Sequence, residues 1–125
     1  MVLAPPFPLF YFPVTHYMKL ASGPFDRMEA GVKKLEIRLH DEKRSLVQVG
    51  EPIEFSRLPD LERKIVRVVE EVMLFSSFDV CFSNIDVSLL GYDLTVSRTD
   101  LARGMYTYYA VEEEKAYGVV AFLFQ

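Results

Sequence analysis

A long run of strand-forming residues constrains the fold of this chain more than any other feature. The segment from Lys64 to Phe75 is rich in Val and Ile and contains no Gly or Pro. Such a composition predicts a long β-strand. Polar residues at Arg67, Glu70 and Glu71 interrupt its apolar character. We therefore expect a strand that is not uniformly buried.

A second predicted strand has alternating chemistry. Between Lys33 and Leu39, apolar and charged side chains follow one another strictly. Because successive side chains of a strand point to opposite faces, this pattern predicts one buried face and one charged face. The buried face would carry Leu35, Ile37 and Leu39, and the charged face would carry Lys34, Glu36 and Arg38.

The remaining segments predict a mixed fold. Further strands are expected at residues 16–20, 53–57 and 117–124, and residues 112–116 are expected to form a polar turn. The first predicted helix has Ser22 or Gly23 as its cap and Pro24 at its first position. Further helices are predicted after Asp41, after Ser76 or Ser77, and from Ser97 to about residue 110. Helices segregated from a mostly antiparallel sheet define the α+β class. The pattern alone does not distinguish a small barrel from an open sheet.

Length and composition indicate one compact domain preceded by an unusual segment. The chain has 125 residues, which suits a single core. Residues 1–15 are apolar and interrupted by four prolines, which predicts an extended arm or extension ahead of a domain at residues 16–125. The arm carries no positive residue before its apolar part, and this argues against a signal peptide. No apolar run is long enough to span a bilayer, and the single Cys81 excludes a disulfide within the chain. We therefore expect a cytoplasmic protein.

Several catalytic and metal-binding motifs are absent from the sequence. It contains no Gly-rich phosphate loop and no nucleophile elbow, and His16 and His40 have no partners at zinc-ligand spacing. Cys81 lies between Val80 and Phe82, which predicts a core position. We therefore predict no metal site and no cofactor.

A cluster of charged residues is the strongest candidate for a functional site. Glu36 and Arg38 share one face of the predicted strand, and Lys33 stands at its beginning, with Lys43 and Arg44 following after a turn. Arginine pairs bidentately with phosphate, and a glutamate accepts a hydrogen bond from an exocyclic amine of a base. The cluster therefore suits a nucleotide, although the same residues also suit a surface network of ion pairs. The net charge of −4 does not favour non-specific nucleic-acid binding. The basic residues are concentrated in the first half of the chain, however, because residues 1–67 hold 11 Lys and Arg against 9 Asp and Glu.

These residues also carry a resemblance to a known family. Gly31, Lys33, Glu36 and Arg38 match the G-x-K-x-x-E-x-R motif of the ASCH domains, a branch of the PUA-like superfamily. The sequence from Leu39 to Arg44 resembles the continuation of that motif in small stand-alone ASCH proteins. Weaker matches follow in order at residues 49–55, 75–78, 90–91, 108–109 and 117–120, so the resemblance covers about residue 16 to the end.

The resemblance implies a small PUA-like β-barrel with flanking helices around a cleft that interacts with RNA. Some small members of the family are amidohydrolases of acetylcytidine that use the motif lysine, a threonine three residues later and a later glutamate. Lys33 matches the lysine, Glu36 stands at the threonine position, and no glutamate lies between Glu71 and Glu112. Other members are associated with RNA cleavage by a lysine with tyrosine and serine hydroxyls. The candidates here are Lys33, either Ser76 or Ser77, and either Tyr108 or Tyr109.

Three functions follow from these observations. The first is a module that binds RNA, a nucleotide or a modified nucleoside. Glu36 would orient the cations, Ser77 and Tyr109 would complete the site, and phosphate or base would be bound by Lys33, Arg38, Lys43 and Arg44. The second is a hydrolase acting on RNA or a modified nucleoside, with Lys33 and Glu36 as its catalytic residues. The third is a protein-interaction domain in which the apolar arm binds a partner or forms a homodimer with a second copy of the chain. No membrane partner is expected.

Overall fold

The structure, a computed structural model, describes residues 14–93 and 95–125 of the chain. Within this part, strands β1 (His16–Leu20), β2 (Leu35–Leu39), β3 (Pro52–Arg57), β4 (Lys64–Phe75) and β5 (Val119–Phe124) form one sheet in the order β1-β3-β4-β5-β2. β1 runs parallel to β3, whereas the other neighbouring strands are antiparallel. The predicted arm lies outside the described residues except for its last two, residues 14 and 15.

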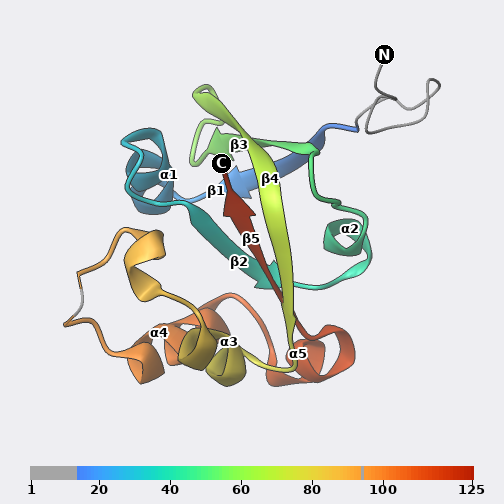
Figure 1. The fold of residues 1–125 in the computed structure, drawn as a ribbon, viewed down its shortest axis with the longest axis vertical. Helices are drawn as coiled ribbons and strands as arrows, with labels where there is room; N and C mark the ends of the chain where they lie inside the picture. The colour runs from blue at the N-terminus through green and yellow to red at the C-terminus, as the bar shows by residue number, and fades with distance from the viewer. Residues whose placement is uncertain (1–13, 94) are drawn as a thin grey trace, which may run out of the picture.

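β4 joins the two halves of this sheet and gives it its curvature. Its first half pairs with β3 and its second half with β5, and the register shifts between Val69 and Glu71. Such an irregularity bends a strand and increases its twist. The sheet consequently curls into a half-barrel, with the long β4 running through its centre (Figure 1). The edges of this half-barrel are β1 and β2.

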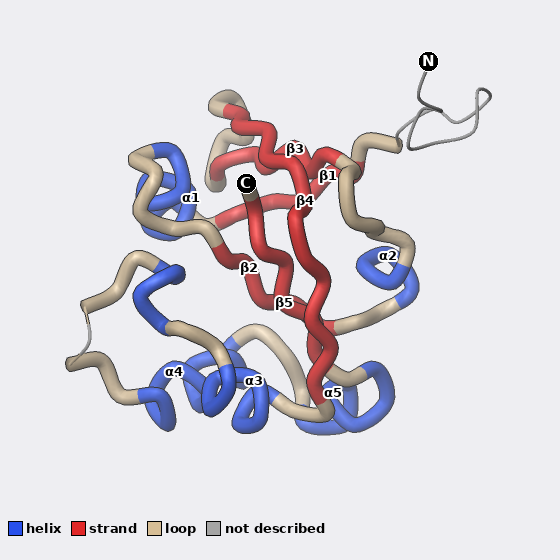
Figure 2. Tube along the Cα trace, viewed as in Figure 1, coloured by secondary structure: helices blue, strands red, loops and turns tan. Residues whose placement is uncertain are grey.

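Helices gather mainly at one end of the strands. Helices α3 (Phe78–Asn84), α4 (Arg98–Gly104) and α5 (Val111–Tyr117) lie together there, while α1 (Ser22–Glu29) and α2 (Glu42–Ser45) flank the sheet on opposite sides (Figure 2). Short 3₁₀ turns, η1 (Val87–Leu90) and η2 (Met105–Thr107), connect and extend this group. No described helix has the length and apolar character needed to cross a bilayer. The predicted α+β class and its barrel-like curl are both confirmed.

Two hydrophobic cores lie on opposite faces of the sheet. One fills the half-barrel under α1 and contains Phe25, Phe55 and Phe122, all fully buried. The other lies between the sheet and α3 and α4 and contains Leu35, Phe78 and other buried residues. β5 contributes alternate side chains to both cores, which explains why nearly all of it is buried.

Local capping signals in the sequence correctly predicted several helix starts. The side chains of Asp41, Ser77 and Ser97 accept hydrogen bonds from the backbone N–H of the third residue beyond each. These bonds satisfy donors that a helix N-terminus leaves unpaired. The first helix differs by two residues from its prediction, because it begins at Ser22 with Ala21 as its N-cap residue.

Two predictions of local structure were wrong. The segment expected as a polar turn is helix α5, and its run of acidic residues occupies the first turn, where carboxylates interact favourably with the helix dipole. Glu113 accepts a bond from the N–H of Ala110, and buried Glu114 accepts bonds from the N–H of Phe78 and the hydroxyl of Tyr106. The helix that starts after Ser97 ends at Gly104 rather than near residue 110, and continues as the turn η2.

Candidate functional site

The charged cluster predicted from the sequence forms a buried network at the start of β2. α1 ends before Gly31, whose φ of 81° lies in the left-handed region that favours glycine, and the chain then turns toward β2. This turn places the Nζ of Lys33 3.1 Å from Oε1 of Glu36. The Nε of Arg38 donates to Oε2 of Glu36 at 2.7 Å. One carboxylate therefore holds two cations.

Most of the charged face predicted for this strand is buried. Lys33 is 5% exposed and Glu36 is 6% exposed, and Lys33 also donates to the carbonyl of Leu35. Glu36 pairs in register with Phe122 of β5, so its side chain lies on the face that carries the half-barrel core. Lys34, at the beginning of the segment, is exposed.

Arg38 connects the two edges of the half-barrel. Its Nη2 donates to the carbonyl of Lys19 on β1 at 2.6 Å. β1 and β2 are the first and last strands of the sheet order, and no ladder joins them in the described residues. A side chain thus spans the gap that a further strand would fill in a closed barrel.

The two cations determine the charge of Glu36. Burial alone would raise the pKa of this carboxyl group, but the positive charges of Lys33 and Arg38 and their hydrogen bonds outweigh burial. The pKa of Glu36 is consequently lowered below its ordinary value. The network therefore has one negative and two positive charges at neutral pH, and a net charge of +1.

A hollow of about 550 Å³ opens over this network and is called the central cleft here. Its volume lies within the usual range of small-ligand sites. The charged residues that line it are the cations Lys19, Arg27, Lys33 and Arg38 and the acids Glu36 and Asp100. The cleft therefore carries a net charge of +2, although the whole chain carries −4.

Three tyrosines line the central cleft beside these charges. Tyr108 is 73% exposed and Tyr92 is 37% exposed, so both offer ring faces to a ligand. The guanidinium of Arg27 lies 4.6 Å from the ring centre of Tyr92 and donates to its hydroxyl at 3.1 Å. Arg27 is thereby held at the rim in a cation–π contact.

Tyr109 is the inner tyrosine of the central cleft. Its ring stacks on the buried ring of Phe78 at 5.7 Å. Burial raises the pKa of its hydroxyl, and the positive charges of Arg38 and Arg44 oppose that increase. Tyr109 is therefore a neutral hydrogen-bonding group close to two guanidinium groups.

The structure brings together only some of the predicted site residues. Lys33, Glu36, Arg38 and Tyr109 line the central cleft, whereas Lys43, Arg44 and Ser77 do not. Arg44 pairs with Asp41 on its own helix at 3.0 Å, and Lys43 is exposed beside it. The hydroxyl of Ser77 accepts the N–H of Val80 as a helix cap. We therefore assign these three residues to local structure.

Sequence reasoning missed several residues that line the central cleft. Lys19, Arg27, Tyr92 and Asp100 belong to β1, α1, the loop after η1 and α4. Tyr92 and Asp100 lie far beyond the motif in the sequence, whereas Lys19 and Arg27 precede it on other elements. Their convergence depends on the curl of the sheet and on how α4 packs against α3.

Other reactive groups lie away from the central cleft. Burial raises the pKa of the Cys81 thiol to about 12, so this residue is a core side chain, as predicted. His16 is buried and its Nε2 lies 3.0 Å from Oε1 of Glu51. The described residues contain no group of three or more side chains suited to hold a metal ion.

Comparisons with known proteins identify the class of this fold. The sequence matches no family model and no curated protein. Among solved structures, the hypothetical protein PH0355 superposes with a TM-score of 0.75 at 28% identity, over 90% of this chain and 98% of that one. Protein PF0455 from Pyrococcus furiosus gives a TM-score of 0.63 at 24% identity, over 90% and 96% of the two chains. These similarities establish an α+β half-barrel fold shared with small proteins of the same length.

A further similarity identifies this fold more closely. A point mutant of the ASCH protein from Zymomonas mobilis superposes with a TM-score of 0.60 at 14% identity, over 89% of this chain and 68% of that one. The described part of the chain therefore shares the fold of an ASCH protein, as the resemblance of the sequence motif led us to expect.

Proposed function

We propose that this protein binds single-stranded RNA or a nucleotide in the central cleft. One observation carries the proposal: four cations and three tyrosines converge on one hollow of nucleotide size in a chain that is acidic as a whole. Cations attract phosphate groups, and aromatic rings stack on unpaired bases. The similarity of the fold to an ASCH protein supports the same function.

Each part of a nucleotide has a suitable partner in the central cleft. Lys19 is exposed on β1, and Arg27 is fixed at the rim, so both suit the phosphate group. Tyr108 offers the most exposed ring and suits stacking on a base. Glu36 keeps its charge and has acceptor capacity beyond its two ion pairs, so its carboxylate suits an exocyclic amine.

Hydrolysis in the same cleft is the less supported function. A carboxylate with a lowered pKa is a weak base at neutral pH, and Glu36 is held between two cations. The buried thiol of Cys81 is outside the cleft and protonated. The residues of the central cleft therefore favour binding over bond cleavage.

Titration of the protein with a labelled single-stranded RNA hexamer tests the proposed function. We expect the affinity to fall as salt increases, because phosphate binding releases counterions. Lys19→Ala should weaken binding and reduce that salt dependence, whereas Lys43→Ala, which removes the same charge outside the cleft, should not. Tyr108→Ala should weaken binding about 5- to 150-fold, the range expected for one stacked base, and Tyr117→Ala on α5 is its exposed control.

The same samples distinguish the two functions. Wild-type protein that does not bind the RNA at low salt would contradict the proposal, as would equal losses in the cleft variants and their controls. Chromatography of the RNA after each titration, and of acetylcytidine incubated in parallel, would reveal cleavage or deacetylation. Product formation that disappears in Lys33→Ala would replace the binding module with the hydrolase.

A further inference from the structure

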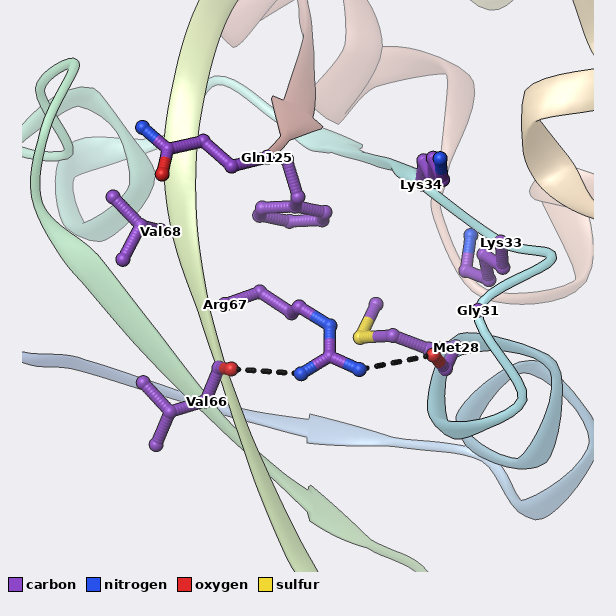
Figure 3. Close-up of a pocket in the computed structure, with 9 residues that line it drawn as sticks. Met28, Gly31, Lys33, Lys34, Val66, Arg67, Val68 and Gln125 are labelled. Carbon is purple, nitrogen blue, oxygen red and sulfur yellow. Dashed lines mark hydrogen bonds between the residues drawn. The ribbon is translucent and has the colours of Figure 1, made fainter.

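A second hollow lies on the other side of Lys33. It has a volume of about 340 Å³ and is called the Arg67 pocket here. Its lining residues come from α1, the segment before β2, β4 and the end of β5: Met28, Gly31, Lys33, Lys34, Val66, Arg67, Val68, Phe124 and Gln125. Figure 3 shows Arg67 reaching from β4 toward Met28, with Lys33 and Lys34 on the segment that leads into β2.

The side chains of the Arg67 pocket have a pronounced positive bias. Three of the nine lining residues are cations, and none is an aspartate or glutamate. Lys33 is paired with Glu36, but Lys34 and Arg67 have no ion-pair partner among residues 14–93 and 95–125. These two charges therefore remain available to an anion.

The guanidinium of Arg67 is held in place without being neutralised. Its Nη1 donates to the carbonyl of Val66 at 3.0 Å and its Nη2 to the carbonyl of Met28 at 3.3 Å. Both partners are uncharged backbone groups. A guanidinium has five N–H donors, so three remain without a partner in the described part of the chain. A fixed cation loses little conformational freedom when a ligand binds.

Apolar side chains form the rest of the Arg67 pocket. Met28 and Phe124 are buried, and Val66 and Val68 continue the apolar surface along β4. Apolar walls displace water from around the cations and so strengthen their attraction to an anion. The pocket thus suits a phosphate group that is attached to a larger molecule.

Lys33 connects the Arg67 pocket to the central cleft, because this residue lines both hollows. A chain of nucleotides that places one unit in the central cleft can therefore continue past Lys33. We propose that the Arg67 pocket binds the phosphate of the nucleotide that adjoins the one in the central cleft. This inference rests on the proposed function, and it extends the ligand from one nucleotide to a strand with a defined path.

Two probes that differ by one nucleotide test this path. Uridine 5′-monophosphate occupies only the central cleft, whereas the dinucleotide pUpU adds a second phosphate for the Arg67 pocket. We expect wild-type protein to bind pUpU about tenfold more tightly than the mononucleotide, since a hydrogen-bonded ion pair contributes about this factor. Arg67→Gln should abolish the preference while changing the affinity for the mononucleotide less than twofold. Arg103→Gln on exposed α4, outside both hollows, should retain the preference.

A second variant distinguishes a loss of phosphate binding from a folding defect caused by Arg67→Gln. Lys34→Gln changes an exposed side chain, so it should leave the melting temperature unchanged and still reduce the preference for pUpU. A preference that survives both Arg67→Gln and Lys34→Gln would overturn the inference, as would equal loss of affinity for both probes. Equal binding of the two probes by the wild type would overturn the path alone, whereas binding of neither probe would overturn the proposed function as well.

Discussion

Replacement of Glu36 by glutamine should destabilise the protein strongly, although the two side chains have nearly the same shape. Glu36→Gln removes the one carboxylate that forms ion pairs with both Lys33 and Arg38 in the described structure. At the observed distances of 3.1 and 2.7 Å, each ion pair has a gross attraction of about 5–6 kcal/mol at an effective dielectric constant of 20. The cost of desolvating the charges offsets part of this attraction.

The net loss follows from what remains after the substitution. Removing one partner of a buried ion pair costs about 3–5 kcal/mol, because an uncompensated charge stays in the interior. The guanidinium of Arg38 stays charged and cannot limit this cost by releasing a proton. A free energy of unfolding lower by about 4 kcal/mol corresponds to a urea midpoint lower by about 2 M. Such a loss is a large fraction of the total stability of a small domain.

Equilibrium unfolding in urea, monitored by circular dichroism, measures this effect. Glu71→Gln on β4 is the matched control, because Glu71 is exposed and has no ion pair in the described structure. Its effect should stay within about 0.5 kcal/mol. The double variant Glu36→Gln with Lys33→Met should lose less free energy of unfolding than the two single variants lose together, because it also removes one of the cations left without a partner. A loss below about 1 kcal/mol in Glu36→Gln would refute the reasoning.

The pH dependence of the free energy of unfolding provides an independent test of the charge on Glu36. Glu36 has a folded-state pKa below its ordinary value of 4.5, so the unfolded chain binds its proton more readily than the folded chain. The stabilisation from Glu36 is therefore fully present above about pH 4.5 and is lost as the pH falls through the folded pKa. The difference in stability between wild type and Glu36→Gln should narrow as the solution is acidified below pH 4.5. A difference that stays constant down to the acid unfolding transition would contradict this assignment.

Three further predictions address the scaffold around the site. Cys81 should resist iodoacetamide at pH 8 in the folded protein and react within minutes in urea, because burial raises its pKa to about 12; fast labelling of the native protein would contradict its core position. Gly31→Ala should cost about 1–2 kcal/mol from its φ of 81° alone, whereas Gly104→Ala at the end of α4 should be neutral or stabilising, and equal urea midpoints would refute the distinction. Asp41→Ala should cost about 1 kcal/mol in the same assay through loss of the α2 cap, and an unchanged midpoint would contradict this.

Local signals in the sequence predicted most of the elements that frame the site. The apolar run of β4 and the alternation in β2 gave both strands, because strand pairing depends on side-chain periodicity that a short segment already contains. Caps such as Asp41 and Ser77 were also predicted, since their hydrogen bonds reach only three residues along the chain. Helix α5 was missed because its acidic first turn resembles a solvated turn until the partners of buried Glu114 are known.

The candidate site was only half predictable, for a reason that lies in the topology of the sheet. The family motif named Lys33, Glu36 and Arg38, but a strand with one apolar and one charged face normally exposes its charges. Here that face turns inward, because β2 is the last strand of a curled sheet and lies near its first strand β1. The ion pairs of Glu36 with Lys33 and Arg38 therefore lie at the seam between the two sheet edges, where Arg38 also contacts the Lys19 carbonyl. A network that links the two sheet edges and lines a cleft couples stability to ligand binding. Ligands that contact Arg38 should therefore raise the urea midpoint of the wild type, and at equal concentration a tighter ligand should raise it further.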